Sequence, residues 1–158
     1  MKRYCMVMVL GVSFIVPSLY AATLSFLIME TGVDTGPIHE YSQVWENALM
    51  DLSFDLGHII SNAPILQVKS APAQGLPAEA VPYRDAVSNG NFEFFVLVVL
   101  QYENEGSAQK LRSVVLKLYR VKPFVLLSEL VSGAALGSAR EEFARAKGAA
   151  QVLFSAVP

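Results

Sequence analysis

The alternation of apolar and polar positions divides the first half of the chain into recognisable segments. Residues 23–30 form an apolar, β-branched run that predicts a buried strand, followed by a Gly- and Asp-containing loop. Between about residues 38 and 60, apolar side chains recur every three or four positions, which predicts one face of a long helix. The recurring residues are Tyr41, Trp45, Ala48, Leu49, Leu52, Leu56 and Ile59. Residues 65–68 predict a short second strand.

The second half begins with a segment of different composition. Residues 69–77 are rich in Pro, Ala and Gly without an apolar period, so we expect a mobile, exposed segment there, followed by a short helix over 78–88. Three β-rich runs then predict an antiparallel meander: 92–102, 111–121 and 124–131. A polar loop of roughly seven to nine residues and a tight turn join them. Every position from 94 to 100 is apolar, which is typical of a central strand covered on both faces.

The final segment has a helix-start signal. Ser138 and Glu141 match the Ser-x-x-Glu capping box, so a last helix is predicted to begin there. Its apolar stripe comprises Ala139, Phe143, Ala146, Ala150, Leu153 and Phe154. We also expect an i,i+4 ion pair between Glu141 and Arg145 on its solvent side.

The predicted order of elements is β-α-β-α-β-β-β-α, an α+β fold with a single mixed sheet and helices packed on it. This order resembles the periplasmic domains of the CsgG-like and TolB amino-terminal group, on the basis of residues 41–60 (YSQVWENALMDLSFDLGHII), residues 91–100 (NFEFFVLVVL) and the strand pair that follows. The resemblance implies an assembly or scaffolding module of the bacterial envelope, with protein partners and no chemistry. The chain lacks the lipid-bearing cysteine and the long insert of the CsgG pattern, so a secretion pore is not implied.

The beginning of the chain predicts export. Lys2 and Arg3 precede an uncharged run over 4–20 and the small pair Ala21 and Ala22, which is the layout of a secretory signal peptide over residues 1–22. An uncleaved anchor is the alternative, because apolar sequence continues to Met29. Residues 23–158 then form one α+β domain, and we expect a periplasmic or secreted protein. The only cysteine, Cys5, lies in the leader, so the rest has neither disulfide nor thiol nucleophile.

Composition and net charge limit the classes of binding partner that we expect. The chain is 53% hydrophobic and 16% charged, which excludes a disordered protein. Its net charge of −2 lacks the basic excess that nucleic acid requires. Without Lys2 and Arg3 the charge falls to about −4, which is unsuited to an anionic membrane surface. We therefore expect no nucleic acid, and membrane contact only through an uncleaved leader.

Two polar groups are candidates for chemistry. Asp51, Asp55 and His58 share one flank of the long helix and could ligate a metal, although a solvated flank is the ordinary interpretation. The loop after the first strand is the other group: it brings together Glu30, Asp34, His39 and Glu40. This loop is where a small hydrolase or metal-dependent enzyme would have its site. Turn formation and helix capping explain the same residues without chemistry.

The sequence contains none of the familiar catalytic motifs: no nucleophile elbow, phosphate-binding loop, zinc motif or dinucleotide fingerprint. We therefore predict no enzymatic activity, no cofactor and no metal site. Met50 and Phe54 lie near the helix face opposite Trp45, which suggests a partner contact or cover by residues 69–77. The prediction is a non-enzymatic envelope module that binds an envelope protein or itself, and a membrane-anchored structural protein is a further alternative.

Overall fold

The computed structural model describes residues 21–33, 36–70, 75–105 and 108–157, which form one mixed six-stranded sheet. Strand β1 (Thr23–Thr31) pairs in parallel with two short strands at one edge, β2 (Ile59–Asn62) and β3 (Leu66–Val68), and with β4 (Phe94–Glu105) on its other side. Antiparallel β5 (Ala108–Arg120) and β6 (Val125–Ser132) continue the sheet, and β6 forms its far edge.

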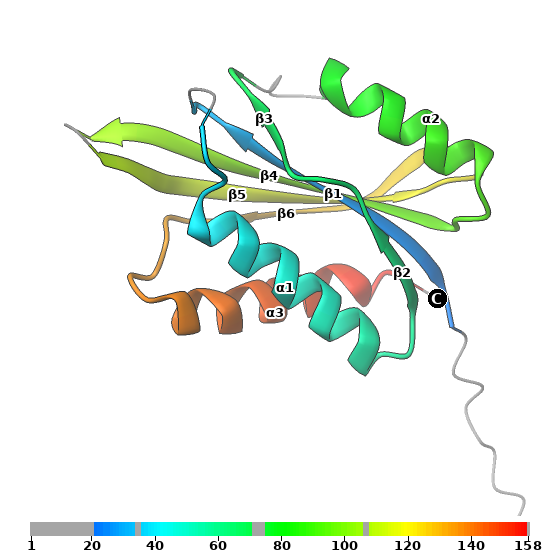
Figure 1. Ribbon diagram of the computed structural model, residues 1–158. Coiled ribbons are helices and arrows are strands. Elements are labelled where there is room, and N and C mark those ends of the chain that lie inside the picture. The colour runs from blue at the N-terminus through cyan, green and yellow to red at the C-terminus, as the bar shows by residue number, and fades with distance from the viewer. Residues whose placement is uncertain (1–20, 34–35, 71–74, 106–107, 158) are drawn as a thin grey trace, which may run out of the picture.

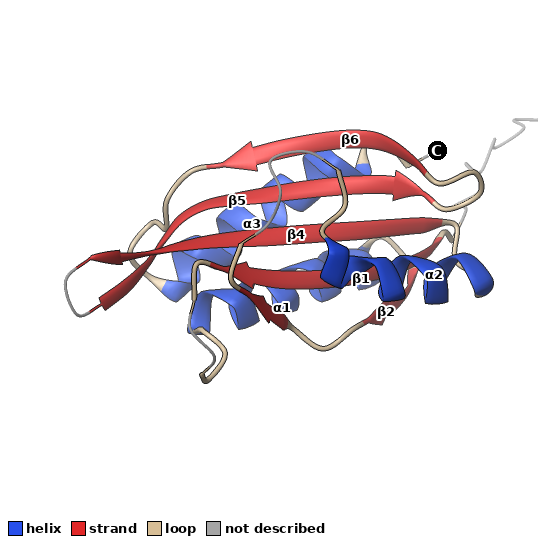
Figure 2. Cartoon of the chain, turned by 90° about the horizontal axis from the view of Figure 1, so that it is seen from above, coloured by secondary structure: helices blue, strands red, loops and turns tan. Residues whose placement is uncertain are grey.

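The helices divide between the two faces of the sheet. Helices α1 (Glu40–Asp55) and α3 (Ala139–Phe154) lie side by side on one face, whereas α2 (Val81–Asn89) and the short 3-10 turn η1 (Ala78–Ala80) lie on the other (Figures 1 and 2). The predicted α+β class and single mixed sheet are therefore confirmed, and the order of elements differs from the predicted one by an additional strand, β2, after α1.

Two apolar layers follow from the alternation of side chains along β1 and β4. Leu24, Phe26 and Ile28 belong to the layer beneath α1 and α3, and Leu27 and Met29 belong to the layer on the α2 side. Strand β4 behaves in the same way and is flanked by β1 and β5. The prediction that residues 94–100 form a central strand covered on both faces is confirmed.

The predicted end of the long helix was wrong. The helix stops at Asp55 because Gly57 adopts a positive φ of 74°, and the amides of Gly57 and His58 donate to the carbonyls of Phe54 (3.0 Å) and Ser53 (2.9 Å). These two hydrogen bonds together form a Schellman cap, in which glycine is the favoured residue at the position with positive φ. Ile59 consequently starts β2 rather than ending the helix, and the predicted strand over 65–68 shares its edge of the sheet with β2.

The meander is longer than predicted. Strands β4 and β5 extend as far as Glu105 and Ala108, so only residues 106 and 107 separate them where we expected a longer polar loop. Charged side chains pair across the extension: Arg112 Nε lies 3.0 Å from Glu103 Oε2, and Lys110 Nζ lies 2.9 Å from Glu105 Oε2. Cross-strand ion pairs let polar sequence continue a hairpin without an apolar face.

Some predictions fall wholly or partly outside the described residues. The signal peptide or anchor over 1–22 does so except for Ala21 and Ala22, and Ala22 is fully buried immediately before β1. Of the segment 69–77, residues 71–74 are not described, and its predicted mobility stays a prediction. Among the described residues, no helix is both long and apolar enough to cross a membrane.

Candidate functional site

The loop after β1 places a buried carboxylate at the start of α1. Glu30 is fully buried and accepts hydrogen bonds from the His39 amide (2.8 Å) and from Gln67 Nε2 (2.8 Å). His39 is the N-cap residue of α1, and its imidazole stacks on Tyr102 with ring centres 4.3 Å apart. Glu30 thus accepts the hydrogen bond from the N-cap amide that the N3 carboxylate of a capping box would otherwise accept. Asp34 lies outside the described residues.

This geometry gives the loop a structural role. Both oxygens of Glu30 are engaged, and Glu40 is an exposed residue of the first helical turn. Burial raises the pKa of Tyr102, whose hydroxyl lies 3.0 Å from Ser42 Oγ, so the phenol stays protonated. Sequence analysis did not anticipate Tyr102 and Ser42 as members of this cluster, because they come from distant segments.

The structure separates His58 from the two carboxylates with which it was grouped as a possible metal ligand. Asp51 and Asp55 each lie 2.6 Å from Lys147 Nζ of α3. His58 instead accepts a hydrogen bond from the Ala22 amide at Nδ1 (3.3 Å), and burial lowers its pKa. Within the described part of the chain, no three His, Cys, Asp or Glu side chains are grouped so that they could hold a metal ion. This arrangement fits the ordinary interpretation, a solvated polar flank of the helix, and adds an ion pair to α3 that was not predicted.

Met50 and Phe54 differ in exposure. The Phe54 side chain is 62% exposed, whereas Met50 is half-buried and packs against the core beneath α1. Their role as a partner contact stays a prediction.

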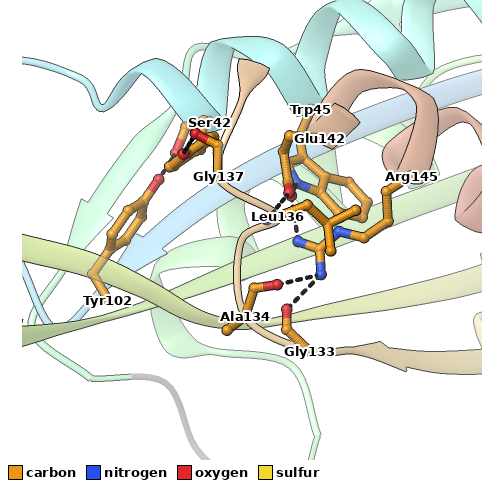
Figure 3. A network of polar contacts seen from close by, with 10 residues as sticks. Ser42, Trp45, Tyr102, Gly133, Ala134, Leu136, Gly137, Glu142 and Arg145 are labelled. Carbon is orange, nitrogen blue, oxygen red and sulfur yellow. Dashed lines mark hydrogen bonds and ion pairs between the residues drawn. The ribbon is translucent and has the colours of Figure 1, made fainter. Parts of the chain in front are cut away.

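A charged cluster that sequence analysis missed joins α1 to α3. Glu142 is fully buried; its Oε1 accepts a hydrogen bond from Trp45 Nε1 (2.7 Å) and forms an ion pair with Arg145 (Figure 3). The guanidinium carbon of Arg145 also lies 5.7 Å from the Trp45 ring centre, within cation–π range. The expected pair between Glu141 and Arg145 was wrong, because Glu141 bonds to the capping Ser138 instead.

The same cluster holds the connection from β6 to α3. Arg145 donates to the carbonyls of Gly133 (2.7 Å) and Ala134 (2.8 Å), and Glu142 Oε2 accepts from the Leu136 amide (3.1 Å), as Figure 3 shows. Glu142 is spaced four and eight residues before two buried alanines of α3, so helical periodicity could have identified it as buried. Its partners could not be read from that spacing.

Strand β6 carries four of the eight large apolar side chains that are exposed among the described residues. Only the side of β6 next to β5 is paired, and four of its apolar side chains are exposed: Val125, Leu126, Leu127 and Val131. Within the strand, Glu129 is the single charged residue, and there is no proline or lysine. A register shift beside Leu127 is the one feature that interrupts regular pairing. Natural edge strands usually carry more protection against pairing with other chains.

Comparisons with known proteins find similar folds only. No protein-family model matches the chain, and no curated protein matches it. A PelC dodecamer from Paraburkholderia phytofirmans has 11% identity and a TM-score of 0.49, over 86% of this chain and 88% of that chain. TolB from Acinetobacter baumannii has 16% identity and a TM-score of 0.46, over 87% of this chain but 28% of TolB. Lipoprotein GNA1162 from Neisseria meningitidis has 8% identity and a TM-score of 0.45, over 85% of this chain and 98% of that chain.

At sequence identities this low, the likeness concerns the arrangement of helices and strands and says nothing about partners or activity. The resemblance to TolB expected from the sequence is found again at this level. The resemblance to the CsgG group is not shown by these structures.

Proposed function

We propose that this protein is a non-enzymatic envelope domain that acts by binding protein, and that the outer edge of β6 is its contact surface. The observation that supports this proposal most directly is an edge strand with four exposed apolar side chains and one charge. An extended segment can add to such an edge through main-chain hydrogen bonds, while alternate side chains supply the specificity.

Two further features favour binding over catalysis in an envelope compartment. The carboxylates proposed for chemistry serve as a helix cap at Glu30 and as ion pairs with Lys147 at Asp51 and Asp55. Export is supported by the charged start, the uncharged run and the small pair Ala21 and Ala22. The bound segment belongs either to another envelope protein or to a second copy of this chain.

A charge on the strand edge tests the proposal. Val131→Lys introduces the residue that natural edges use against pairing, at a side chain that is 65% exposed. Val152→Lys is the matched control, because Val152 is 61% exposed but lies on α3. Both variants should fold, since exposed substitutions usually change stability by about 0.5 kcal/mol or less.

Sedimentation velocity of the purified protein measures self-association, and a photo-crosslinker at position 131 in cells identifies a different partner. We expect Val131→Lys to abolish whichever contact is present, and Val152→Lys to preserve it. If a folded Val131→Lys variant keeps its contacts, or if no contact with either kind of partner involves position 131, the β6 surface is not the binding site.

A further inference from the structure

A hollow of about 600 Å³ lies over β5 and β6 on the side of the sheet that carries α2. Helix α2 packs over β1 and β4 and borders the hollow without crossing β5 and β6 (Figure 2). The volume is in the range of small-molecule sites. Its lining combines apolar, aromatic and charged side chains: Leu76, Arg84, Lys117, Tyr119, Phe124, Leu126 and Glu129, together with Gly75.

Lys117 is the unusual member of this lining. It is only 7% exposed, yet its two contacts, with Glu129 Oε2 and with the Gly75 carbonyl, are both 3.5 Å long. Hydrogen bonds from an ammonium to a carboxylate normally measure about 2.7–2.9 Å, and a lysine offers three donors. A buried ammonium requires close acceptors to offset its lost hydration. Lys117 therefore has donor capacity that the described residues satisfy weakly.

Two other donors line the same hollow. Arg84 pairs with Asp85 (2.6 Å), and its guanidinium carbon lies 5.9 Å from the Phe124 ring centre. The Tyr119 ring stacks on Phe124 with centres 4.8 Å apart, and its hydroxyl forms no hydrogen bond with any described residue. Burial, and then the charge of Glu129, raise the pKa of Tyr119, so the phenol is a neutral donor at pH 7.

We infer that this hollow binds an organic carboxylate with an apolar or aromatic body. The carboxylate accepts hydrogen bonds from Lys117 and from Arg84 or Tyr119, and the body packs against Phe124 and the apolar wall. Glu129 beside Lys117 disfavours a phosphate, which has close to two negative charges at neutral pH. The inference does not depend on strand addition at β6.

The experiment compares phenylacetate with phenylacetamide, which has a similar shape and no charge. Binding to the full protein is followed by calorimetry, and the variants are Lys117→Met and, as a control, Lys110→Met. Lys110 is an exposed lysine at the other end of β5. We expect phenylacetate to bind about tenfold or more tightly than the amide, and Lys117→Met to lose at least the same factor. Lys110→Met should have no effect.

Lys117→Met should remain folded, because methionine needs no acceptors and Glu129 stays solvated at 42% side-chain exposure. Arg84→Gln, at a half-exposed residue, is a second variant and should also weaken binding. A short peptide that ends in a phenylalanine carboxylate separates the two sources of the ligand. Tighter binding of the peptide than of phenylacetate identifies a protein C-terminus, and weaker or equal binding identifies a free acid.

Three results would overturn the inference. They are an absence of phenylacetate and peptide binding at millimolar concentrations, equal affinity for phenylacetate and phenylacetamide, and unchanged affinity in a folded Lys117→Met variant.

Discussion

Glu142 and Lys117, buried charged side chains on opposite faces of the sheet, differ in how close their hydrogen-bond partners lie. On the face beneath α1 and α3, Glu142 is fully buried and has close partners in Trp45, Arg145 and the Leu136 amide. On the other face, Lys117 is almost as deeply buried, but its nearest acceptors are 3.5 Å away. Buried polar groups are usually well paired, so the first arrangement is what stability requires and the second needs another explanation.

The difference follows from how each face is covered. Two helices of sixteen residues pack on the first face, whereas a nine-residue helix and a 3-10 turn cover part of the second. Fixed helices can position acceptors around a charge, whereas partial cover leaves a hollow beside Lys117. The β6 edge is exposed for a separate reason, since no strand pairs with its outer side. The two faces therefore have separate tasks: the first stabilises the fold, and the second is where we propose binding.

The largest effect is expected at the centre of the face covered by α1 and α3, which we call the closed face. Trp45→Ala should lower the free energy of unfolding by about 3–5 kcal/mol, because Trp45 is fully buried and its removal leaves a cavity. Trp45→Phe keeps much of the volume but leaves Glu142 without one donor, so it should cost less, about 1–3 kcal/mol. Urea unfolding followed by circular dichroism measures both changes. A change near zero for Trp45→Ala would contradict a closed face.

Smaller losses of stability are expected when Met50 and Phe54, which are neighbours on α1, are each replaced by Glu. Met50→Glu places a charge at the rim of the core and should cost about 1–3 kcal/mol. Phe54→Glu should cost about 0.5 kcal/mol or less, because Phe54 is exposed. Equal losses in urea unfolding would show that Phe54 is covered by another part of the chain. If Phe54 contacts a partner, the folded Phe54→Glu variant should lose a protein that is captured by cross-linking of intact envelopes.

The smallest effect concerns the rim of the closed face, where the His58 ring lies edge-on to Phe154. Burial lowers the pKa of His58 below its ordinary 6.5, so the unfolded chain binds a proton more readily than the folded one. The stabilisation by neutral His58 is complete above about pH 6.5 and is lost as the pH falls through the lowered pKa. His58→Asn should remove this part of the acid dependence when Tm is measured between about pH 5 and pH 8. An identical pH profile in both proteins would contradict a desolvated imidazole.

Much of the fold could be predicted from local patterns. The continuous apolar run from Phe94 to Leu100 identified the central strand, and the Ser138 cap identified the start of α3. The errors occurred where a local signal competed with periodicity. Gly57 ended α1 although the apolar spacing continued to Ile59, because a residue with positive φ caps a helix whatever the pattern beyond it.

The candidate site was less predictable. Of the residues chosen for their chemistry, Asp51 and Asp55 contact Lys147 of α3, whereas His58 contacts the Ala22 amide. The exposed edge of β6 was predicted as one strand of a meander, and nothing in its alternation showed that it would be the last strand of the sheet. Edge position depends on which strands pair, and pairing is a property of the whole sheet.

By itself, the sequence determined most of the strands and helices and which helix faces are apolar, because these depend on spacings of a few residues. Only the tertiary structure decided which partners the buried charged side chains have. Glu142 meets Trp45 from 97 positions away, and Lys117 comes within reach of the Gly75 carbonyl from 42 positions away. Whether a buried charge acquires close partners or faces a hollow depends on which distant segments the fold places around it, and that choice separates the stabilising face of this protein from the face proposed to bind.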